Sequence, residues 1–487
     1  MMKNLLKKYQ SFPVQVKASF WFLLTSIFQK GISVFTTPIF TRLLTPEEFG
    51  QFNVFLSWQS LLTVIVILYL PWGVYEQGVI KFEESKDEFT SSLLGLDTTL
   101  VLTWALIYLS FNGFFNKLLT LNTYQGLAML VMMWTSSGFS FWAIQKRSSY
   151  HYKKLVTVTF LTSLFKPILG IYLVTNFTDK VTARIIGLAA VEVIMYSGLI
   201  FSEFSKGNVF FKKDVWKYAI LFNITLIPHY LSQTVLNSAD RIMIQKLVGY
   251  REAGIYSLAY SLSQLMLIFN TAVLQTMNPW IYRQIKSKNI SDISSRTYPI
   301  LIFIMFINLL LVIFAPEIVQ IFAPAKYYEA IWIIPPVAMS VAFIFMYSMF
   351  AIFEFYFEKT RWISVATLIG AVLNIFLNFI FINLFGYIAA GYTTLVCYLI
   401  YAISHFYFMN RVVREFTSSQ KVYEFKKISL LSIAFMSFGL LIMLTYPLPV
   451  LRYTILGAII TLSIIFRNRI LEFLKDLVQL RQSSSGD

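Results

Sequence analysis

The stretch PIFTRLLTPEEFGQFNVFLSWQSLL (38–62) has a counterpart farther along the chain, DRIMIQKLVGYREAGIYSLAYSLSQLM (240–266). Ordered pairs link the two copies: Leu44 and Gly50 with Leu247 and Gly254, Phe52 with Tyr256, Ser57 with Ser261, and Leu61 with Leu265. After one inserted helical turn the match resumes, with Pro71-Trp72 and Tyr75 opposite Pro279-Trp280 and Tyr282. Ordered pairings across two helices and the loop between them predict an internal duplication.

The composition indicates that most of the chain lies in a membrane. Hydrophobic residues make up 57% of the 487 residues and charged residues 13%, against roughly 45–50% and 25% in soluble domains. The apolar runs are continuous over about 18–25 residues, which suits membrane-spanning helices and not the short alternating segments of a β-barrel. We therefore predict an all-α polytopic membrane protein with about fourteen transmembrane helices, at 18–41, 49–72, 90–111, 124–145, 155–177, 183–204, 217–239, 253–280, 298–322, 331–356, 363–384, 388–410, 428–446 and 450–466.

The basic residues are distributed unevenly between the predicted loops. With a cytoplasmic N-terminus, the inward segments hold 29 of the 40 Lys and Arg residues and the outward loops hold nine. This is the positive-inside pattern, and an even number of spans then places both termini in the cytoplasm. The net charge of +16 is thus explained by orientation and by contact with anionic membrane lipids. Nucleic acid is not a predicted partner.

The position of the repeat predicts how the spans are grouped. Six spans separate the copies, and an even number returns the chain to the same side, so the copies form parallel repeats about an axis along the membrane normal. We expect an N-terminal lobe (1–205), a C-terminal lobe (206–412), and two added helices with a tail (413–487). In transporters of this kind the solute binds in a central cavity between the lobes, and rocking of the lobes alternates access.

The remaining features of the chain add few functional elements. The first apolar run has full length and lacks a small-residue cleavage site, so we expect no cleavable signal peptide. A single cysteine, Cys397, excludes an intramolecular disulfide and a cysteine-based metal site, and we predict no metal. Apolar residues at helical spacing after Arg467 predict a short amphipathic helix on the inner membrane surface: Ile470, Leu471, Leu474, Leu477 and Val478.

The first span carries a polar stripe. Ser26, Lys30, Ser33, Thr37 and Thr41 are spaced by four, three, four and four residues, which places them on one helix face. A lysine at mid-membrane costs roughly 2.5–3.5 kcal/mol on the insertion scale, so Lys30 should face protein or water. We favour a position lining the cavity over a structural ion pair buried between helices.

The seventh span carries polar residues at the equivalent positions. Applying the repeat offset of 203 residues to the stripe leads to His229, Gln233 and Asp240. This agreement is independent of the motif that suggested the repeat, and it predicts that the first and seventh spans face each other across the cavity. His229 taken alone is more often an interior histidine whose hydrogen bonds are satisfied.

Charged residues also lie inside three spans of the N-terminal lobe. Lys166 is in the middle of the fifth span, with no acid within one turn, and its nearest candidate partners are Asp97 in the third span and Glu192 in the sixth. Mutual neutralisation and contact with a ligand both remain open for these residues. Together with His229 and Asp240, the two acids are the candidates for ion coupling or charge pairing.

Three polar residues lie in spans of the C-terminal half. Asn374 and Asn378, one turn apart in the eleventh span, are predicted to hold helices together. Glu354 lies near the inner end of the tenth span, and we expect it to be solvated.

Two segments carry a family resemblance: TRLLTPEEFGQF (41–52) and SADRIMIQKLVGYREAGIYSLAY (238–260). Set among fourteen spans, they resemble the polysaccharide repeat-unit (Wzx-type) flippases of the multidrug, oligosaccharidyl-lipid and polysaccharide exporter superfamily. The resemblance covers essentially the whole chain. It implies a protein of the bacterial inner membrane, not an enzyme, that flips an undecaprenyl-pyrophosphate-linked oligosaccharide to the outer leaflet for capsule, O-antigen or exopolysaccharide assembly.

The resemblance also implies a cationic lumen and coupling to a sodium or proton gradient, without a cofactor. Lys30 and Lys166, with Arg42 and Arg241 near the outer mouth, are the positions that match such a lumen, and Gln233 joins them as a substrate-binding candidate. The implied partners are the lipid-linked oligosaccharide, membrane lipids and other polysaccharide-assembly proteins.

Two other functions fit parts of this pattern. A membrane polymerase or ligase of the same pathway needs a sizeable outward loop with catalytic residues, whereas the outward loops here are short and gather no acid, base and basic clamp. A multidrug or organic-solute exporter of the same superfamily remains the main alternative. An exporter of cations needs net acid in its cavity, whereas Lys30 and Lys166 favour an anion.

Overall fold

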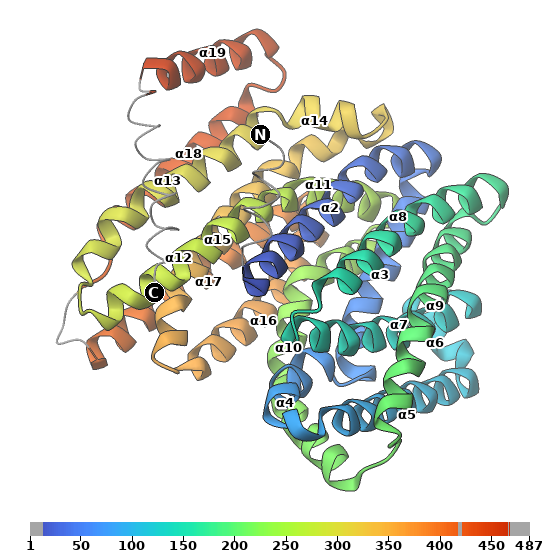
Figure 1. The fold of residues 1–487 in the computed structure, drawn as a ribbon. Helices are drawn as coiled ribbons and strands as arrows, with labels where there is room; N and C mark the ends of the chain where they lie inside the picture. The colour runs from blue at the N-terminus through green and yellow to red at the C-terminus, as the bar shows by residue number, and fades with distance from the viewer. Residues whose placement is uncertain (1–12, 417–420, 466, 468–487) are drawn as a thin grey trace, which may run out of the picture. The chain divides into compact units, whose positions relative to one another are not determined.

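The computed structural model describes residues 13–416, 421–465 and 467. This part of the chain is helical and contains no β-strand, which confirms the predicted fold class. The chain divides into two compact units, Met1–Ile242 and Met243–Asp487, here called unit 1 and unit 2. Figure 1 colours the helices in chain order.

Unit 1 contains the first seven candidate membrane spans. A π-helical turn (Pro71–Tyr75) and a 3₁₀ turn (Glu83–Ser85) accompany its helices: α2 (Val14–Leu43), α3 (Pro46–Val66), α4 (Glu76–Lys81), α5 (Lys86–Ser110), α6 (Asn112–Leu119), α7 (Thr123–Ser148), α8 (Tyr152–Asn176), α9 (Lys180–Gly207) and α10 (Lys213–Leu247). The boundary between the units falls after Ile242, within α10, so most of this helix belongs to unit 1. The lobe boundaries at residues 205 and 412 stay predictions.

Unit 2 contains six further candidate spans. Two 3₁₀ segments, η3 (Gln264–Met266) and η4 (Ala325–Trp332), accompany its helices: α11 (Tyr250–Ser263), α12 (Leu267–Lys286), α13 (Ser291–Ile313), α14 (Ala315–Phe322), α15 (Ile334–Tyr356), α16 (Thr360–Phe385), α17 (Ala389–Phe416), α18 (Phe425–Leu444) and α19 (Pro449–Ile465).

The repeat motif determines where α3 begins. The Thr45 hydroxyl accepts from the backbone N–H of Glu48, and the Glu48 carboxylate accepts from the backbone N–H of Thr45 at 2.7 Å. This capping box satisfies two N–H groups, and Pro46 at the first helical position has no N–H to satisfy. The sequence TPEE therefore ends the loop after α2 and starts the second span.

Thirteen described helices are long and apolar enough to cross a membrane. The fourteenth predicted span corresponds to α19, whose 17 residues extend about 26 Å at 1.5 Å per residue, near the lower limit for a span. The predicted ninth span is shorter than expected because the chain breaks at Phe314, ahead of Pro316, and continues as the separate helix α14. The amphipathic helix predicted at 470–478 lies outside the described residues.

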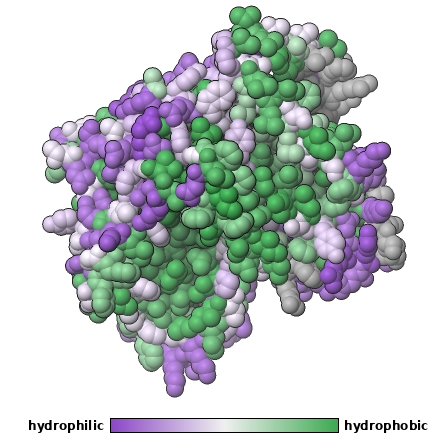
Figure 2. Space-filling model, turned by 180° about the vertical axis from the view of Figure 1, so that it is seen from behind, coloured by the Kyte–Doolittle hydropathy of each residue, from purple (hydrophilic) through white to green (hydrophobic). Residues whose placement is uncertain are grey.

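Large apolar side chains are exposed on both units. Phe35 on α2 of unit 1 and Leu444 on α18 of unit 2 are 77% and 72% exposed, and hydrophobic residues cover a large part of the face shown in Figure 2. Such surfaces are unfavourable in water and match the hydrocarbon of a bilayer.

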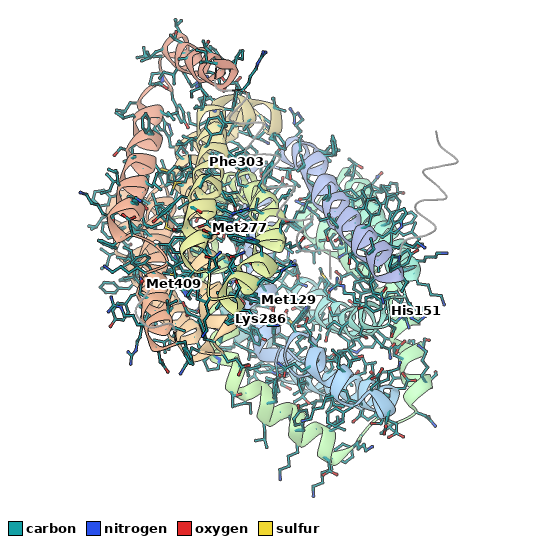
Figure 3. The ribbon with its side chains drawn as sticks, turned by 60° about the vertical axis from the view of Figure 1, so that its left-hand side comes forward. Met129, His151, Met277, Lys286, Phe303 and Met409 are labelled. Carbon is teal, nitrogen blue, oxygen red and sulfur yellow. The ribbon has the colours of Figure 1, made fainter. Side chains whose placement is uncertain are left out.

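Each unit also has an apolar interior. Met129, labelled in Figure 3, belongs to the core of unit 1, and Met277 and Met409 belong to that of unit 2. Polar side chains join helices within these cores. The Thr393 hydroxyl of α17 donates to Asn378 of α16, and Asn378 donates to Asn374 at 3.3 Å. The predicted role in helix-to-helix contact is confirmed for Asn378, and for Asn374 it stays a prediction.

Glu354 is placed differently from the prediction. We expected it to be solvated, but its side chain is fully buried and its Oε1 lies 2.7 Å from Nδ1 of His405, which is also fully buried. The prediction is wrong because α15 is packed inside unit 2 along most of its length, so the end of the apolar run is not the end of burial. The rings of Tyr347 and Tyr401 flank His405.

A polar cluster surrounds the short segment η4 of unit 2. Glu329 of η4 accepts from the Tyr387 hydroxyl and lies 3.1 Å from the Arg251 guanidinium. The hydrogen bond from Tyr387 and then the Arg251 cation lower the pKa of the Glu329 carboxyl, against the opposing effect of burial. The cluster joins η4 to α11 and to the connection between α16 and α17.

Candidate functional site

A cavity of about 290 Å³ lies within unit 1 between α2, α8 and α9. Its lining contains two cations and several neutral polar groups, and no carboxylate among the described lining residues. The lining residues are Gln29, Ile32, Ser33, Thr36, Phe40, Ser163, Lys166, Pro167, Gly170, Arg184 and Leu188. We call this space the polar cavity.

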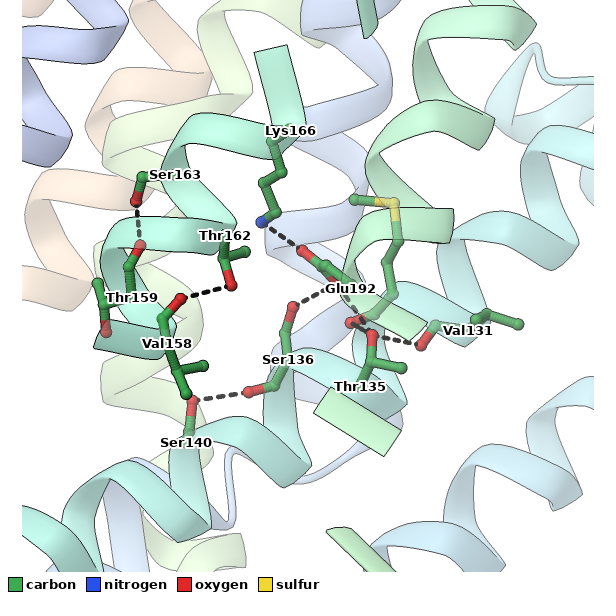
Figure 4. Close-up of polar contacts among 11 residues, drawn as sticks. Val131, Thr135, Ser136, Ser140, Val158, Thr159, Thr162, Ser163, Lys166 and Glu192 are labelled. Atoms are coloured by element: carbon green, nitrogen blue, oxygen red, sulfur yellow. Dashed lines mark hydrogen bonds and ion pairs between the residues drawn. The ribbon is translucent and has the colours of Figure 1, made fainter. Parts of the chain in front are cut away.

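Lys166 is the cation contributed by α8. Its ammonium lies 2.6 Å from Oε1 of Glu192 on α9, and Figure 4 shows this contact at the centre of a polar network. Oε2 of the same carboxylate accepts from the hydroxyls of Thr135 and Ser136 on α7, each at 2.9 Å. Three donors from two helices thus hold a carboxylate that is only 3% exposed.

The exposures of the two partners differ. The Lys166 side chain is 29% exposed and lines the cavity, whereas Glu192 lies behind it. An ammonium has three N–H donors, and among the described residues Glu192 is its hydrogen-bond partner. Lys166 is therefore neutralised by Glu192 and still presents donors to the cavity.

Local sequence explains how α8 and α9 come together here. A Cβ on Gly187 of α9 would lie 3.4 Å from the Gly170 backbone of α8, so the paired glycines let the two backbones approach closely. Pro167, next to Lys166, has no N–H and cannot donate to the Ser163 carbonyl one turn earlier. Pro167 and Gly170 both line the cavity.

Arg184 is the second cation of the polar cavity. Its guanidinium carbon lies 3.6 Å from the ring centroids of Phe40 on α2 and Phe52 on α3. Cation–π contact stabilises a guanidinium away from bulk water. Arg184 also lies near the N-terminus of α9, where the helix dipole adds positive potential.

The predicted polar stripe of α2 contributes one residue to the lining of the polar cavity. Ser33 lines the cavity, but Lys30 is exposed and makes no hydrogen bond or ion pair with a described residue. On α2 the polar cavity is lined by Gln29 and Thr36 beside Ser33 of the predicted stripe, and the predicted place of Lys30 at a cavity between the lobes stays a prediction. Gln29 and Thr36 are spaced by four and three residues from Ser33, a helical pattern that could have indicated them, but neither they nor Arg184 were among the predicted site residues.

Asp97 is not part of the Lys166 network. It is fully buried on α5, accepts from the Ser137 hydroxyl of α7 at 2.7 Å, and has no described partner at Oδ2. It thus joins α5 to α7 as an acid without a cation within ion-pair distance among the described residues.

The candidates on α10 and at the end of α2 lie outside the lining of the polar cavity. Gln233 is exposed, Asp240 is buried, and Nδ1 of His229 is buried without a described hydrogen-bond partner. Arg241 and Arg42 each donate to a backbone carbonyl one turn earlier, at 2.9 Å. Their predicted roles in substrate binding and ion coupling stay predictions.

Among the described residues, no three His, Cys, Asp or Glu side chains gather as a metal site. The polar cavity instead offers ammonium and guanidinium groups with hydroxyl and amide groups around them. Such groups bind anions, including phosphates.

The fold is shared with solved membrane transporters. The structure is similar to the lipid II flippase MurJ in an inward closed conformation, with a TM-score of 0.66 and 14% identity over 92% of this chain and 99% of that chain. It is also similar to an inward-facing multidrug resistance MATE family transporter of the MOP superfamily, with a TM-score of 0.61 and 12% identity over 81% and 96% of the two chains. A MOP superfamily transporter from Pyrococcus furiosus gives a TM-score of 0.56 and 12% identity over 82% and 95%.

At these identities the likeness establishes the fold alone. No curated protein matches the sequence. A family model described as polysaccharide biosynthesis protein matches residues 16–285, which is more than half of the chain and agrees with the resemblance found in the sequence. The chain belongs to the polysaccharide biosynthesis protein family.

Proposed function

We propose that this protein is a flippase that moves an undecaprenyl-pyrophosphate-linked oligosaccharide from the cytoplasmic to the outer leaflet of the bacterial inner membrane. The glycan serves capsule, O-antigen or exopolysaccharide assembly. The observation that carries the proposal is the polar cavity of unit 1, in which Lys166 and Arg184 line a space within the membrane-spanning helices.

The charges of the cavity suit a pyrophosphate. In a low-dielectric space an anion needs compensating positive charge. Lys166 and Arg184 supply this charge, and Gln29, Ser33 and Thr36 supply neutral hydrogen-bonding groups. Lys30 follows Gln29 on the same helix and is exposed. It is a further cation for the anionic head group of the substrate.

A multidrug exporter of the same superfamily is supported less well. The fold is compatible with it, but a cationic drug would meet Lys166 and Arg184 without a carboxylate in the described cavity lining. Efflux of a cationic dye, unaffected by loss of the two lysines, would favour the exporter.

Surface polysaccharide formed by a flippase-null strain tests the proposal. The strain expresses each variant at matched protein levels: Lys30→Ala, Lys166→Ala and the double variant. We expect the double variant to lose most of the polysaccharide, with lipid-linked oligosaccharide accumulating on the cytoplasmic leaflet. Lys117→Ala, an exposed lysine of α6 outside the cavity, is the matched control. Full activity of the double variant rules out a role of Lys30 and Lys166 in binding the anionic head group.

Movement against a gradient requires an energy source, and we propose coupling to sodium or protons. Asp97, Glu192, His229 and Asp240 are the candidates for this role. Collapse of one gradient at a time, in cells that produce the polysaccharide, identifies the ion. Unchanged production after collapse of both gradients contradicts the coupling.

A further inference from the structure

Unit 2 contains a second cavity, of about 650 Å³, between α17 and the start of α18. One part of its wall is apolar and includes Phe406, Tyr407 and Phe425. The other part is basic and consists of Arg414, Lys421 and Lys426. Its volume falls within the range of about 300 to 1,000 Å³ that is typical of ligand sites in proteins.

The neighbouring acids are already paired with other cations. Glu424, which also lines the cavity, lies 2.6 Å from Lys427, and Glu415 lies 2.7 Å from Lys359. Arg414, Lys421 and Lys426 have no hydrogen-bond or ion-pair partner among the described residues. The cavity therefore presents three uncompensated cations beside an apolar wall.

Buried neighbours fix the position of the basic segment. Val422 and Tyr423 are each 2% exposed, and the Tyr423 hydroxyl accepts from Thr297 of α13 at 3.1 Å. Lys421 and Glu424 flank this anchored pair and emerge at the cavity. The arrangement is thus built into the fold of unit 2.

The cavity lies at the ends of two candidate spans. Arg414 is two residues before the end of α17, and Lys426 is the second residue of α18. Span ends lie at the depth of lipid phosphates, where lysine and arginine extend toward the head groups. Phe425 is 64% exposed and Tyr407 63%, and they offer the surface on which an acyl chain packs.

We propose that this cavity is a binding site for one anionic glycerophospholipid. Its phosphate lies against Arg414, Lys421 and Lys426, and one acyl chain follows the wall formed by Phe406, Tyr407 and Phe425. A free phosphate would leave that wall exposed, so the combined basic and apolar lining favours a lipid. Basic pockets at the inner ends of spans bind anionic lipid head groups in this manner. The site is independent of the function proposed for unit 1.

Binding of dioleoyl phosphatidylglycerol to the purified full-length protein in a neutral detergent, counted by native mass spectrometry, tests the site. Each basic residue near a lipid phosphate contributes a factor of roughly five in affinity. We therefore expect Lys421→Gln/Lys426→Gln to weaken binding about thirtyfold. The matched control is Lys286→Gln/Lys288→Gln, which removes two exposed lysines of unit 2 away from the cavity and should change binding less than about threefold.

A second variant tests the apolar wall. Phe425→Ser leaves every cation in place, and its exposed side chain contributes little to folding, so weaker binding with an unchanged melting temperature supports an acyl-chain contact. Dioleoyl phosphatidylcholine should bind weakly to all variants. Three results overturn the proposal: equal losses in the test and control pairs, displacement of the lipid by millimolar inorganic phosphate, or preference for undecaprenyl phosphate over phosphatidylglycerol.

Discussion

Replacing Lys166 with methionine removes the charge and keeps an unbranched side chain of similar length. The Glu192 carboxylate, 3% exposed, then keeps only the hydroxyls of Thr135 and Ser136 as donors. Breaking a buried ion pair by removing one partner costs about 3–5 kcal/mol. Because Lys166 is 29% exposed and the pair is partly hydrated, we expect the lower end, about 3 kcal/mol.

The opposite replacement should cost less. Glu192→Gln strands the ammonium of Lys166, but that group lies at the cavity and can be hydrated, so we expect about 1–2 kcal/mol. The double variant Lys166→Met/Glu192→Gln leaves no buried charge and should be nearly as stable as the natural protein. Lys30→Met is the matched control, because Lys30 is exposed and has no described partner; it should not destabilise unit 1.

Thermal unfolding in detergent measures these differences. For a unit of this size about 1 kcal/mol corresponds to roughly 2–4 °C, so Lys166→Met should lower the midpoint by about 6–12 °C and the double variant should recover most of it. Equal, small shifts for both single variants, or no recovery in the double variant, would refute the assignment of Glu192 as the partner that Lys166 stabilises.

The same variants separate a structural role of Lys166 from a role in transport. If the lysine binds the pyrophosphate, the double variant is stable but forms little surface polysaccharide. If Lys166 only neutralises Glu192, activity returns together with stability. The melting midpoint and the polysaccharide yield of one protein thus distinguish the two interpretations that the sequence left open.

Three further predictions concern other parts of the chain. His405→Leu strands the fully buried Glu354 and should lower unfolding free energy by about 3–5 kcal/mol, seen as a lower midpoint of unfolding. The pKa of Glu329 beside Tyr387 is lowered, so the carboxylate contributes stability above its unfolded pKa, and this contribution is lost as the pH falls through its folded pKa. Glu329→Gln lacks this contribution. Its melting midpoint should therefore fall less than that of the natural protein between about pH 5 and pH 3. A reporter fused after residue 150 should behave as cytoplasmic, and an external signal contradicts the proposed orientation.

The spans and their order were predictable because the bilayer requires long apolar helices, a constraint that acts on sequence directly. The predicted span 124–145 lies inside α7 (Thr123–Ser148), and the predicted 183–204 lies inside α9 (Lys180–Gly207). Errors occurred where a local backbone restriction acted, as at Phe314 and Pro316. Hydropathy averages over such single residues and does not detect them.

Side-chain partners were harder to predict than spans. The choice of Glu192 as a candidate partner for Lys166 followed from the scarcity of acids in the N-terminal spans. Arg184 gave no comparable signal, because its contacts are aromatic rings on α2 and α3 that only the packed helices bring together. On α2 the polar cavity of unit 1 is lined by Gln29 and Thr36 beside the predicted Ser33, while the place of Lys30 at a cavity between the lobes stays a prediction.

The two cations of the polar cavity illustrate how such a site can exist before a ligand binds. An unbalanced charge within the membrane is costly. Each cation is therefore stabilised by a group that does not itself line the cavity or by an aromatic ring. Glu192 balances Lys166 from behind, and the rings of Phe40 and Phe52 stabilise Arg184. On the proposed function, a pyrophosphate therefore meets donors whose charge is already partly compensated. We therefore expect pyrophosphate binding to be favourable but moderate, as release on the other side of the membrane requires.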